Sequence, residues 1–145
     1  MTMVTNSSQV YALVYLSTID KNISIEQGKE VIARRREVNR AIGASGLLIN
    51  SGGNILRLLE GSKETLQKLY DHARLEPQHD VTKIYFGTIP QRYFSDYPLA
   101  LRVVSGNLKP LDDFQSDEMK DYWEMLLELN EPVINLIKDF TRNNS

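Results

Sequence analysis

Residues 45–60, SGLLINSGGNILRLLE, decide the fold of this chain. Two short apolar runs, at 45–50 and 55–60, flank the four residues Ser-Gly-Gly-Asn. Glycine adopts positive φ at little cost, and glycines between two apolar runs are a strong hairpin signal. The stretch therefore predicts two neighbouring antiparallel strands joined by a tight turn.

Apolar patterns outside this hairpin predict the remaining strands and helices. Before it, VYALVYLS at 10–17 is typical of a buried strand, and Ser24 with Gln27 forms a capping box that opens a helix. After it, a second helix precedes strands at 81–87 and 99–104. The order β, α, β, β, α, β is that of a ferredoxin-like sheet. We therefore expect an α+β fold, a ferredoxin-like βαββαβ sheet with an extra strand and two C-terminal helices.

The domain organisation follows from the same patterns. We expect a disordered leader at 1–9, one folded domain at 10–105, and a C-terminal loop and helical pair at 106–145. The helical pair carries apolar side chains that suit either of two roles, covering an exposed sheet face or mediating self-association. These side chains are Met119, Trp123, Leu126 and Phe140.

Composition excludes several classes of protein. Apolar residues make up 41% and charged residues 25% of the 145 residues, and the net charge is -2, so nothing favours binding to nucleic acid or to an anionic membrane. The chain has no cysteine, which excludes disulfides, thiolate nucleophiles and cysteine-ligated metals. No apolar run is long enough for a membrane helix. These features suit a cytoplasmic protein.

Recognisable catalytic and metal-binding motifs are missing from the sequence. The histidines, His72 and His79, are seven residues apart, whereas a helical metal pair needs a spacing of four. The glycines of the hairpin do not precede a helix, which excludes a phosphate-binding loop. We therefore expect that the chain is not an enzyme and holds no metal.

Three polar residues stand at positions that the fold would bury. Asn39 lies inside the first helix, Arg57 lies in the middle of the apolar run 55–60, and Tyr15 lies in the first strand. A buried charge costs free energy unless it is paired. The expected packing brings the three together in one polar pocket. The alternative places Arg57 at a strand edge and Asn39 on a solvated face.

Four blocks of the sequence resemble the BLUF family, the blue-light sensors that use FAD. The resemblance rests on NRAIGASGLL at 39–48, LLEG at 58–61, YALVYLS at 11–17 and EPQH at 76–79, in this order and with these gaps. It covers about residues 10–104 and implies a flavin, FAD or FMN, held between the two helices that cover the sheet. It further implies that Tyr15 donates an electron to the excited flavin. Asn39 and His79 would contact the ring, and Val31 would form an apolar wall.

The sequence departs from the family at the expected pocket. The glutamine whose hydrogen bonds switch in the family falls on Arg57, and a guanidinium can only donate. Arg35 stands where a small residue is usual, on the helix face of Val31 and Asn39. The family's tryptophan and methionine fall on Tyr97 and Leu99, and the oxidisable ring of Tyr97 makes it a candidate alternative electron donor.

Two functions remain open at this point, with a weaker third. The first is a flavin-binding photoreceptor with atypical photochemistry, in which Arg57 favours a reduced or anionic flavin. It would signal by contact with a protein partner, or by self-association, through the C-terminal helices. The alternative is a flavin-free interaction module in which Arg35 and Arg57 fill the ring site, bind a small anion or pair with acids such as Glu60. An acylphosphatase-like enzyme is the third, although no phosphate-binding loop follows the first strand.

Overall fold

The structure, a computed structural model, describes residues 9–74 and 80–144. The expected leader lies almost entirely outside the described residues. The elements follow the order β1 (Val10–Thr18), α1 (Ile25–Ala41), β2 (Ser45–Ser51), β3 (Asn54–Gly61), α2 (Lys63–Arg74), β4 (Thr82–Ile89), β5 (Ala100–Ser105), a 3-10 turn η2 (Lys109–Leu111), α3 (Asp117–Leu127) and α4 (Pro132–Asn143).

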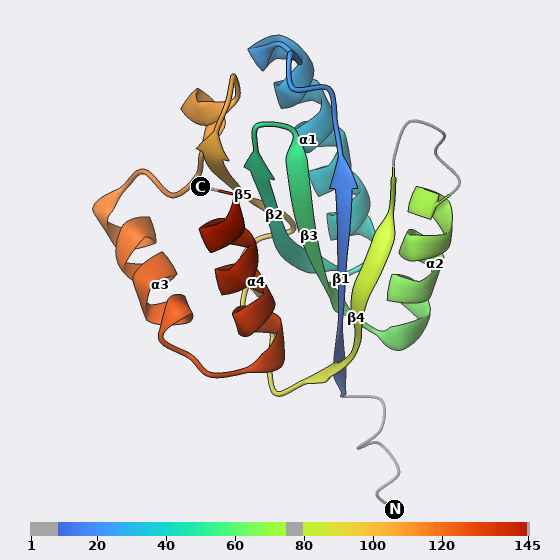
Figure 1. Ribbon diagram of the computed structural model, residues 1–145. Helices are drawn as coiled ribbons and strands as arrows, with labels where there is room; N and C mark the ends of the chain where they lie inside the picture. The colour runs from blue at the N-terminus through green and yellow to red at the C-terminus, as the bar shows by residue number, and fades with distance from the viewer. Residues whose placement is uncertain (1–8, 75–79, 145) are drawn as a thin grey trace, which may run out of the picture.

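One mixed sheet organises the molecule, with strand order β4-β1-β3-β2-β5 (Figure 1). The pairs β1·β3, β1·β4 and β2·β3 are antiparallel, and β5 adds to β2 in parallel. The first four strands with α1 and α2 form the ferredoxin-like unit, and β5 is the extra strand. The predicted fold class is confirmed, and β3 is the central strand of the sheet.

The hairpin turns where its glycines predict. Gly52 has φ 59° and Gly53 has φ 100°, in the left-handed region that side chains disfavour. Asn50 accepts a hydrogen bond from the backbone nitrogen of Gly53 at 3.0 Å, which closes the turn from within. The turn sets the β2·β3 register, so alternate residues of both strands face opposite sides of the sheet.

Capping residues begin and end α1 as the sequence indicates. Gln27 donates from its backbone nitrogen to Ser24 Oγ at 3.1 Å, and Ser24 donates from its backbone nitrogen to Gln27 Oε1 at 3.1 Å. After Ala41 the chain turns at Gly43, whose φ is 74°, and enters β2. These two ends fix which residues of α1 face the sheet.

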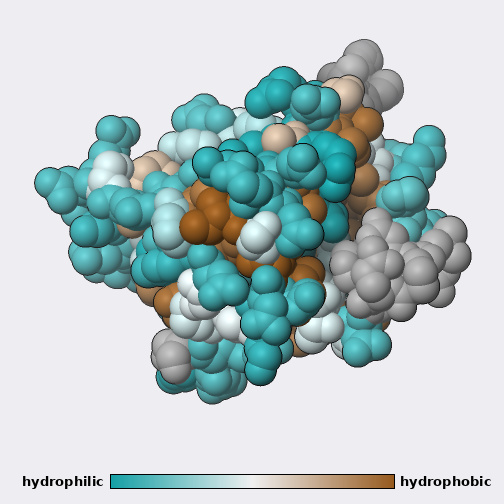
Figure 2. Space-filling view, turned by 90° about the horizontal axis from the view of Figure 1, so that it is seen from above, coloured by the Kyte–Doolittle hydropathy of each residue, from teal (hydrophilic) through white to brown (hydrophobic). Residues whose placement is uncertain are grey.

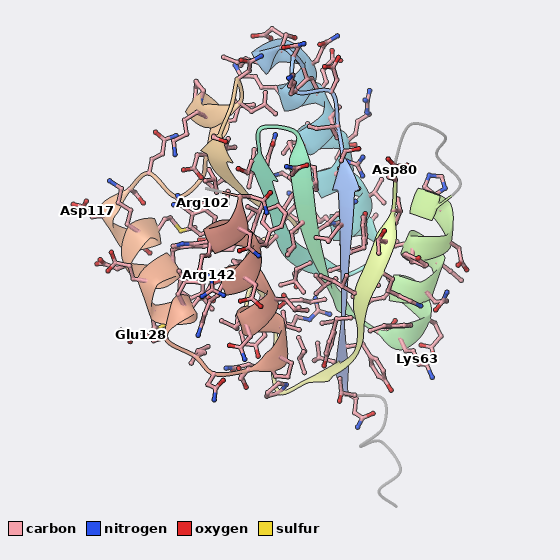
Figure 3. The ribbon with its side chains drawn as sticks, in the orientation of Figure 1. Lys63, Asp80, Arg102, Asp117, Glu128 and Arg142 are labelled. Atoms are coloured by element: carbon pink, nitrogen blue, oxygen red, sulfur yellow. The ribbon has the colours of Figure 1, made fainter. Side chains whose placement is uncertain are left out.

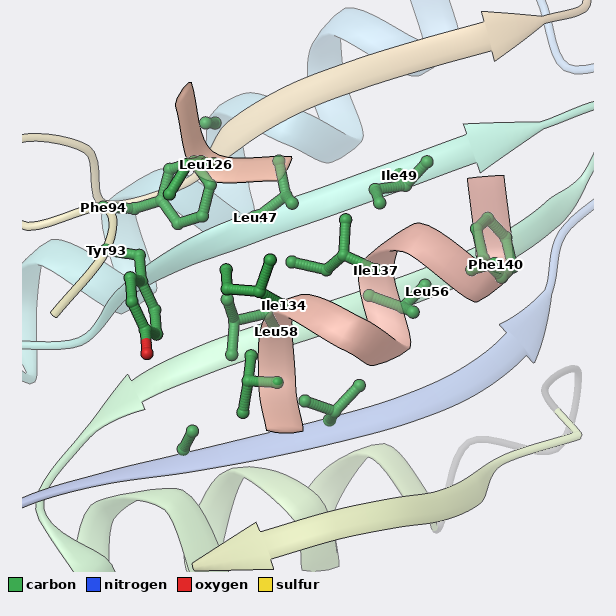
Figure 4. Packing of buried hydrophobic residues seen from close by; sticks show 14 of the residues in the cluster. Leu47, Ile49, Leu56, Leu58, Tyr93, Phe94, Leu126, Ile134, Ile137 and Phe140 are labelled. Carbon is green, nitrogen blue, oxygen red and sulfur yellow. The ribbon is translucent and has the colours of Figure 1, made fainter. Parts of the chain in front are cut away.

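Helices cover both faces of the sheet, α1 and α2 one face and α3 and α4 the other (Figure 1). Leu126 and Phe140 are buried against sheet residues such as Leu56 and Leu58 (Figure 4). Trp123 is buried in the same cluster. Met119 is half-buried at the margin of the same cluster. Of the two roles considered for these side chains, the structure shows that they cover the sheet. Among the described residues, no helix is long and apolar enough to span a bilayer.

Candidate functional site

Arg57 lies on the central strand and faces α1. It pairs across the strands with Tyr15, and both are buried, with exposed fractions of 6% and 4%. Arg57 Nη1 lies 3.2 Å from the hydroxyl oxygen of Tyr15. Because a guanidinium only donates, the phenol oxygen is the acceptor, and the phenol hydrogen remains available for another partner.

Asn39, on α1, is the third member of this buried polar group. Its side chain is fully buried, and its Oδ1 accepts from Arg57 Nη2 at 3.4 Å, a long and therefore weak hydrogen bond. Its Nδ2 donates to the carbonyl oxygen of Pro98 at 2.8 Å. The structure thus brings together Tyr15, Asn39 and Arg57. The alternative, with Arg57 at an edge and Asn39 in solvent, is wrong.

A pocket adjoins this group between α1 and the sheet. Arg35 and Val31, one helical turn apart, line it together with Arg57, and its other walls are mostly aliphatic. Figure 2 shows one end of the molecule, where apolar residues gather at the centre of an otherwise hydrophilic face. The volume of the pocket is about 50 Å³, well below the several hundred Å³ of most ligand pockets. A ring system enters this pocket only if the long arginine side chains move.

One donor in the pocket lacks an acceptor. Among the described residues, Arg57 Nε is buried without a hydrogen-bond partner. A buried donor left unpaired costs about 1–3 kcal/mol. Apolar walls, an oxidisable phenol and an unpaired guanidinium N–H fit a flat, electron-accepting ring that carries hydrogen-bond acceptor atoms at its edge. The residues present therefore fit a flavin in chemistry, whereas a pocket of about 50 Å³ does not hold its ring system in this arrangement of the arginines.

Sequence reasoning missed some residues around this group. Tyr70 of α2 packs against Tyr15 with ring centroids 6.2 Å apart, and Lys83 Nζ lies 5.0 Å from the Tyr70 ring centroid. Ser17 and Asn50 line the pocket from β1 and β2. Strand alternation carries the signal for these two, because Ser17 is two residues from Tyr15 and Asn50 is two from the wall residue Leu48.

Tyr97 and Leu99 do not lie together. Leu99 is buried against Ile32 of α1, on the pocket side of the sheet. Tyr97 points to the opposite side, where its hydroxyl lies 3.2 Å from Met119 Sδ. Alternation would put the two on one face, but β5 begins only at Ala100, so the turn before it orients them separately. Tyr97 is therefore not a wall of the Tyr15 pocket. His79 lies outside the described residues.

Glu60 does not pair with Arg57. Positions 57 and 60 of one strand face opposite sides, so pairing with Glu60, one option considered for the flavin-free module, is wrong. The buried Glu60 carboxylate accepts from the backbone nitrogens of Tyr93 at 2.7 Å and Phe94 at 3.1 Å, and from Ser45 Oγ at 2.9 Å. Burial raises the pKa of Glu60 above its usual range, and these hydrogen bonds oppose the shift.

The fold is shared with solved structures of photoreceptors. Klebsiella pneumoniae BlrP1, solved as a manganese and cyclic-diGMP complex, has a TM-score of 0.72 and 19% identity over 92% of this chain and 33% of its own. BlsA in its photo-activated state gives 0.62 and 17% over 85% of this chain and 98% of its own. BlrB, a BLUF protein in its dark state, gives 0.61 and 18% over 81% and 93%. The chain thus spans about a third of the BlrP1 chain and nearly all of BlsA and BlrB.

Sequence comparison identifies the family directly. No curated protein matches the sequence. The BLUF profile, described as sensors of blue light using FAD, matches residues 10–100, which is more than half of the chain and covers every strand of the ferredoxin-like unit. With the fold and the buried Tyr15, Asn39 and Arg57 group in place, the chain belongs to the BLUF family of blue-light sensors that use FAD.

Proposed function

We propose that this chain is a flavin-binding blue-light sensor whose photochemistry is altered by Arg57. The observation that carries the proposal is the buried hydrogen bond of 3.2 Å from Arg57 Nη1 to the Tyr15 hydroxyl oxygen, next to the unpaired Nε. The family supplies the expectation of a flavin, and Arg57 is the reason to expect photochemistry that differs from the family's.

The chemistry of the pocket follows from what each side chain can exchange. A bound flavin supplies blue-light absorption and an excited state that takes up an electron. Tyr15 is the oxidisable group beside it, and its hydroxyl hydrogen is free to point at a ligand because its oxygen already accepts from Arg57. Arg57 cannot accept that proton, so a switch that exchanges donor and acceptor at this position cannot operate. Its fixed charge instead favours negative charge on the ligand.

A path of hydrogen bonds and backbone leads from the pocket towards the C-terminal helices. Arg57 contacts Asn39, and Asn39 donates to the carbonyl oxygen of Pro98, the residue after Tyr97. Tyr97 in turn contacts Met119 of α3. Movement of Arg57 on ligand binding or illumination would reach the outer face by this path. Output would then pass by contact to a protein partner or to a second copy. The lack of cysteine suits the reducing cytoplasm.

A second function has its own support. The pocket holds only about 50 Å³ with both arginines lining it, and the Asn39 amide already uses both ends within the protein. This arrangement favours a flavin-free interaction module in which Arg35 and Arg57 occupy the former ring site.

Absorption spectroscopy on the chain purified in the dark separates the two functions. The sensor proposal expects flavin absorption, a higher Tm on adding FAD or FMN, and illumination changes other than the family's red shift. It expects Arg57→Gln to bind flavin more tightly and to restore a red shift. Arg102→Gln is the matched control, since Arg102 also has an unpaired buried Nε but lies outside the pocket. A colourless protein whose Tm ignores both flavins, in wild type and Arg57→Gln alike, supports the flavin-free module instead.

A further inference from the structure

A second hollow lies on the opposite side of the sheet, between α3 and the segment 93–97 that precedes β5. It is lined by residues of these two segments and has a volume of about 370 Å³, within the range of ordinary ligand sites. We call it the acidic groove, because its charged lining residues are Asp96, Glu118 and Asp121, all exposed and all acidic. Within residues 9–74 and 80–144, no lysine or arginine lines it.

The groove has an apolar interior. Tyr97 and Tyr122 are half-buried in its walls, and Met125 is exposed at 50%, an unusually high value for a large apolar side chain of this protein. Methionine adapts its shape to irregular apolar partners, and tyrosine offers a rigid ring with a polar tip. Aromatic and methionine side chains between carboxylates form a surface that can receive an apolar strip with cations beside it.

Buried and partly buried hydrogen bonds hold the walls in place. Tyr122 donates from its hydroxyl to the carbonyl oxygen of Tyr93, and the rings of Phe94 and Tyr122 stack edge-on at 6.1 Å. The carboxylate of Glu60, reaching from β3, fixes the backbone nitrogens of Tyr93 and Phe94. The groove is therefore formed before any partner arrives, which lowers the ordering cost of binding.

We propose that the acidic groove is a docking site for a cationic amphipathic segment of a partner protein. Charge complementarity selects this occupant, because three carboxylates without a cation repel nucleic acid and anionic lipid. A second copy of this chain is disfavoured in a symmetric dimer, since an isologous contact would set Asp96, Glu118 and Asp121 against their own counterparts. The groove includes Tyr97 and Met119, where the proposed output path ends, so this inference rests on the proposed function for its signalling role and names the class of partner, whereas the binding itself requires no flavin.

Binding of a synthetic peptide to the full chain tests the proposal. The probe is a fluorescent helical peptide of about 14 residues, roughly four turns, with leucine on one face and lysine on the other. Two reference peptides have the same leucines with glutamate in place of lysine, or the same composition in scrambled order. Fluorescence anisotropy is expected to show binding of the basic amphipathic peptide, weakening as salt rises.

Variants of one helix locate the site. Glu118→Gln with Asp121→Asn is expected to weaken peptide binding about fivefold, and Glu124→Gln with Glu128→Gln, which removes the same charge outside the groove, is expected to leave it unchanged. Met125→Ala should weaken binding, whereas Val38→Ala, at a residue 52% exposed on α1, should not. Thermal unfolding verifies that each variant folds.

The proposal is overturned by any of four results: no binding of the basic peptide, equal binding of a reference peptide, equal weakening by the control pair, or a wild-type dimer that only groove variants dissociate. Flavin absorption is recorded on the same samples. A colourless chain that binds the peptide contradicts the proposed function and leaves the docking site standing.

Discussion

Arg57 and Tyr15 face each other across the two central strands, with the guanidinium donating to the phenol oxygen over 3.2 Å. The pair places a permanent positive charge in the buried centre of the sheet. Arg57 uses Nη1 for Tyr15 and Nη2 for a long contact with Asn39, and its Nε finds no acceptor among the described residues. A buried cation with so few acceptors suits a binding site better than it suits a stable core.

Arg57→Met is therefore expected to stabilise the flavin-free chain, by about 1 kcal/mol, because methionine fills similar space without desolvating a charge. Arg57→Lys keeps the charge but loses the planar fork that reaches two partners, so it should destabilise the chain. Urea unfolding of the two variants against wild type measures both effects. A clear loss of stability in Arg57→Met would show that the Tyr15 contact outweighs the burial cost.

Asn39→Ala is expected to destabilise the chain by about 2 kcal/mol, since it leaves the Pro98 carbonyl without its buried donor and removes an acceptor of Arg57. Asn54→Ala is the control. Asn54 makes a side-chain contact of 3.2 Å with Asn144, but it is exposed, so its loss should cost less than about 0.5 kcal/mol. Equal effects at the two positions would contradict the role of Asn39 in tying α1 to the segment before β5.

The fold was predictable because its signals are local. Gly52 and Gly53 specify the hairpin, the capping box specifies the start of α1, and strand alternation specifies the buried faces. The meeting of Tyr15 and Arg57 was predictable for a related reason. In a βαββαβ sheet β1 must lie beside β3, and residues facing the same helix layer meet once that order is known.

The misplaced contacts involve residues whose orientation no repeat fixes. Tyr97 lies in a turn, where the backbone of 93–97 and not strand alternation decides which side it faces. Its side chain lines the acidic groove on the other side of the sheet. Glu60 obeys alternation, but the expectation about it rested on charge alone. Its partners are backbone nitrogens of a distant segment, which no sequence pattern marks. The chemical type of a residue predicted whether it belongs to the buried polar group better than it predicted its hydrogen-bond partners.

Glu60 should make stability depend on pH. Burial raises its pKa above 4.5, so the folded chain binds the proton more tightly than the unfolded chain does. The stabilisation that comes with this proton is therefore full below the unfolded pKa and is lost as pH rises through the folded pKa. Glu60→Gln cannot titrate and keeps only a constant offset from its changed hydrogen bonds.

Urea unfolding between about pH 4.5 and 8 should show the free energy of unfolding of Glu60→Gln rising relative to wild type as pH increases. Glu124→Gln, at an exposed carboxylate, serves as the control and should show a much smaller trend. A constant difference between Glu60→Gln and wild type across the series would mean that Glu60 stays ionised throughout.

Gly43 and Gly46, the two glycines of the 39–48 block, should differ in their tolerance of substitution by alanine. At Gly46 an added Cβ would lie 2.0 Å from the backbone carbonyl oxygen of Leu58, and the paired strand cannot retreat without disturbing the sheet that holds Arg57. At Gly43 nothing lies within 4 Å of such a Cβ, so the cost there is only that of its positive φ. We expect Gly43→Ala to lower stability by about 1 kcal/mol and Gly46→Ala by about 3 kcal/mol or more, measured by chemical denaturation. If Gly43→Ala were the more damaging, the block would be required for its turn rather than for the close approach of β2 and β3.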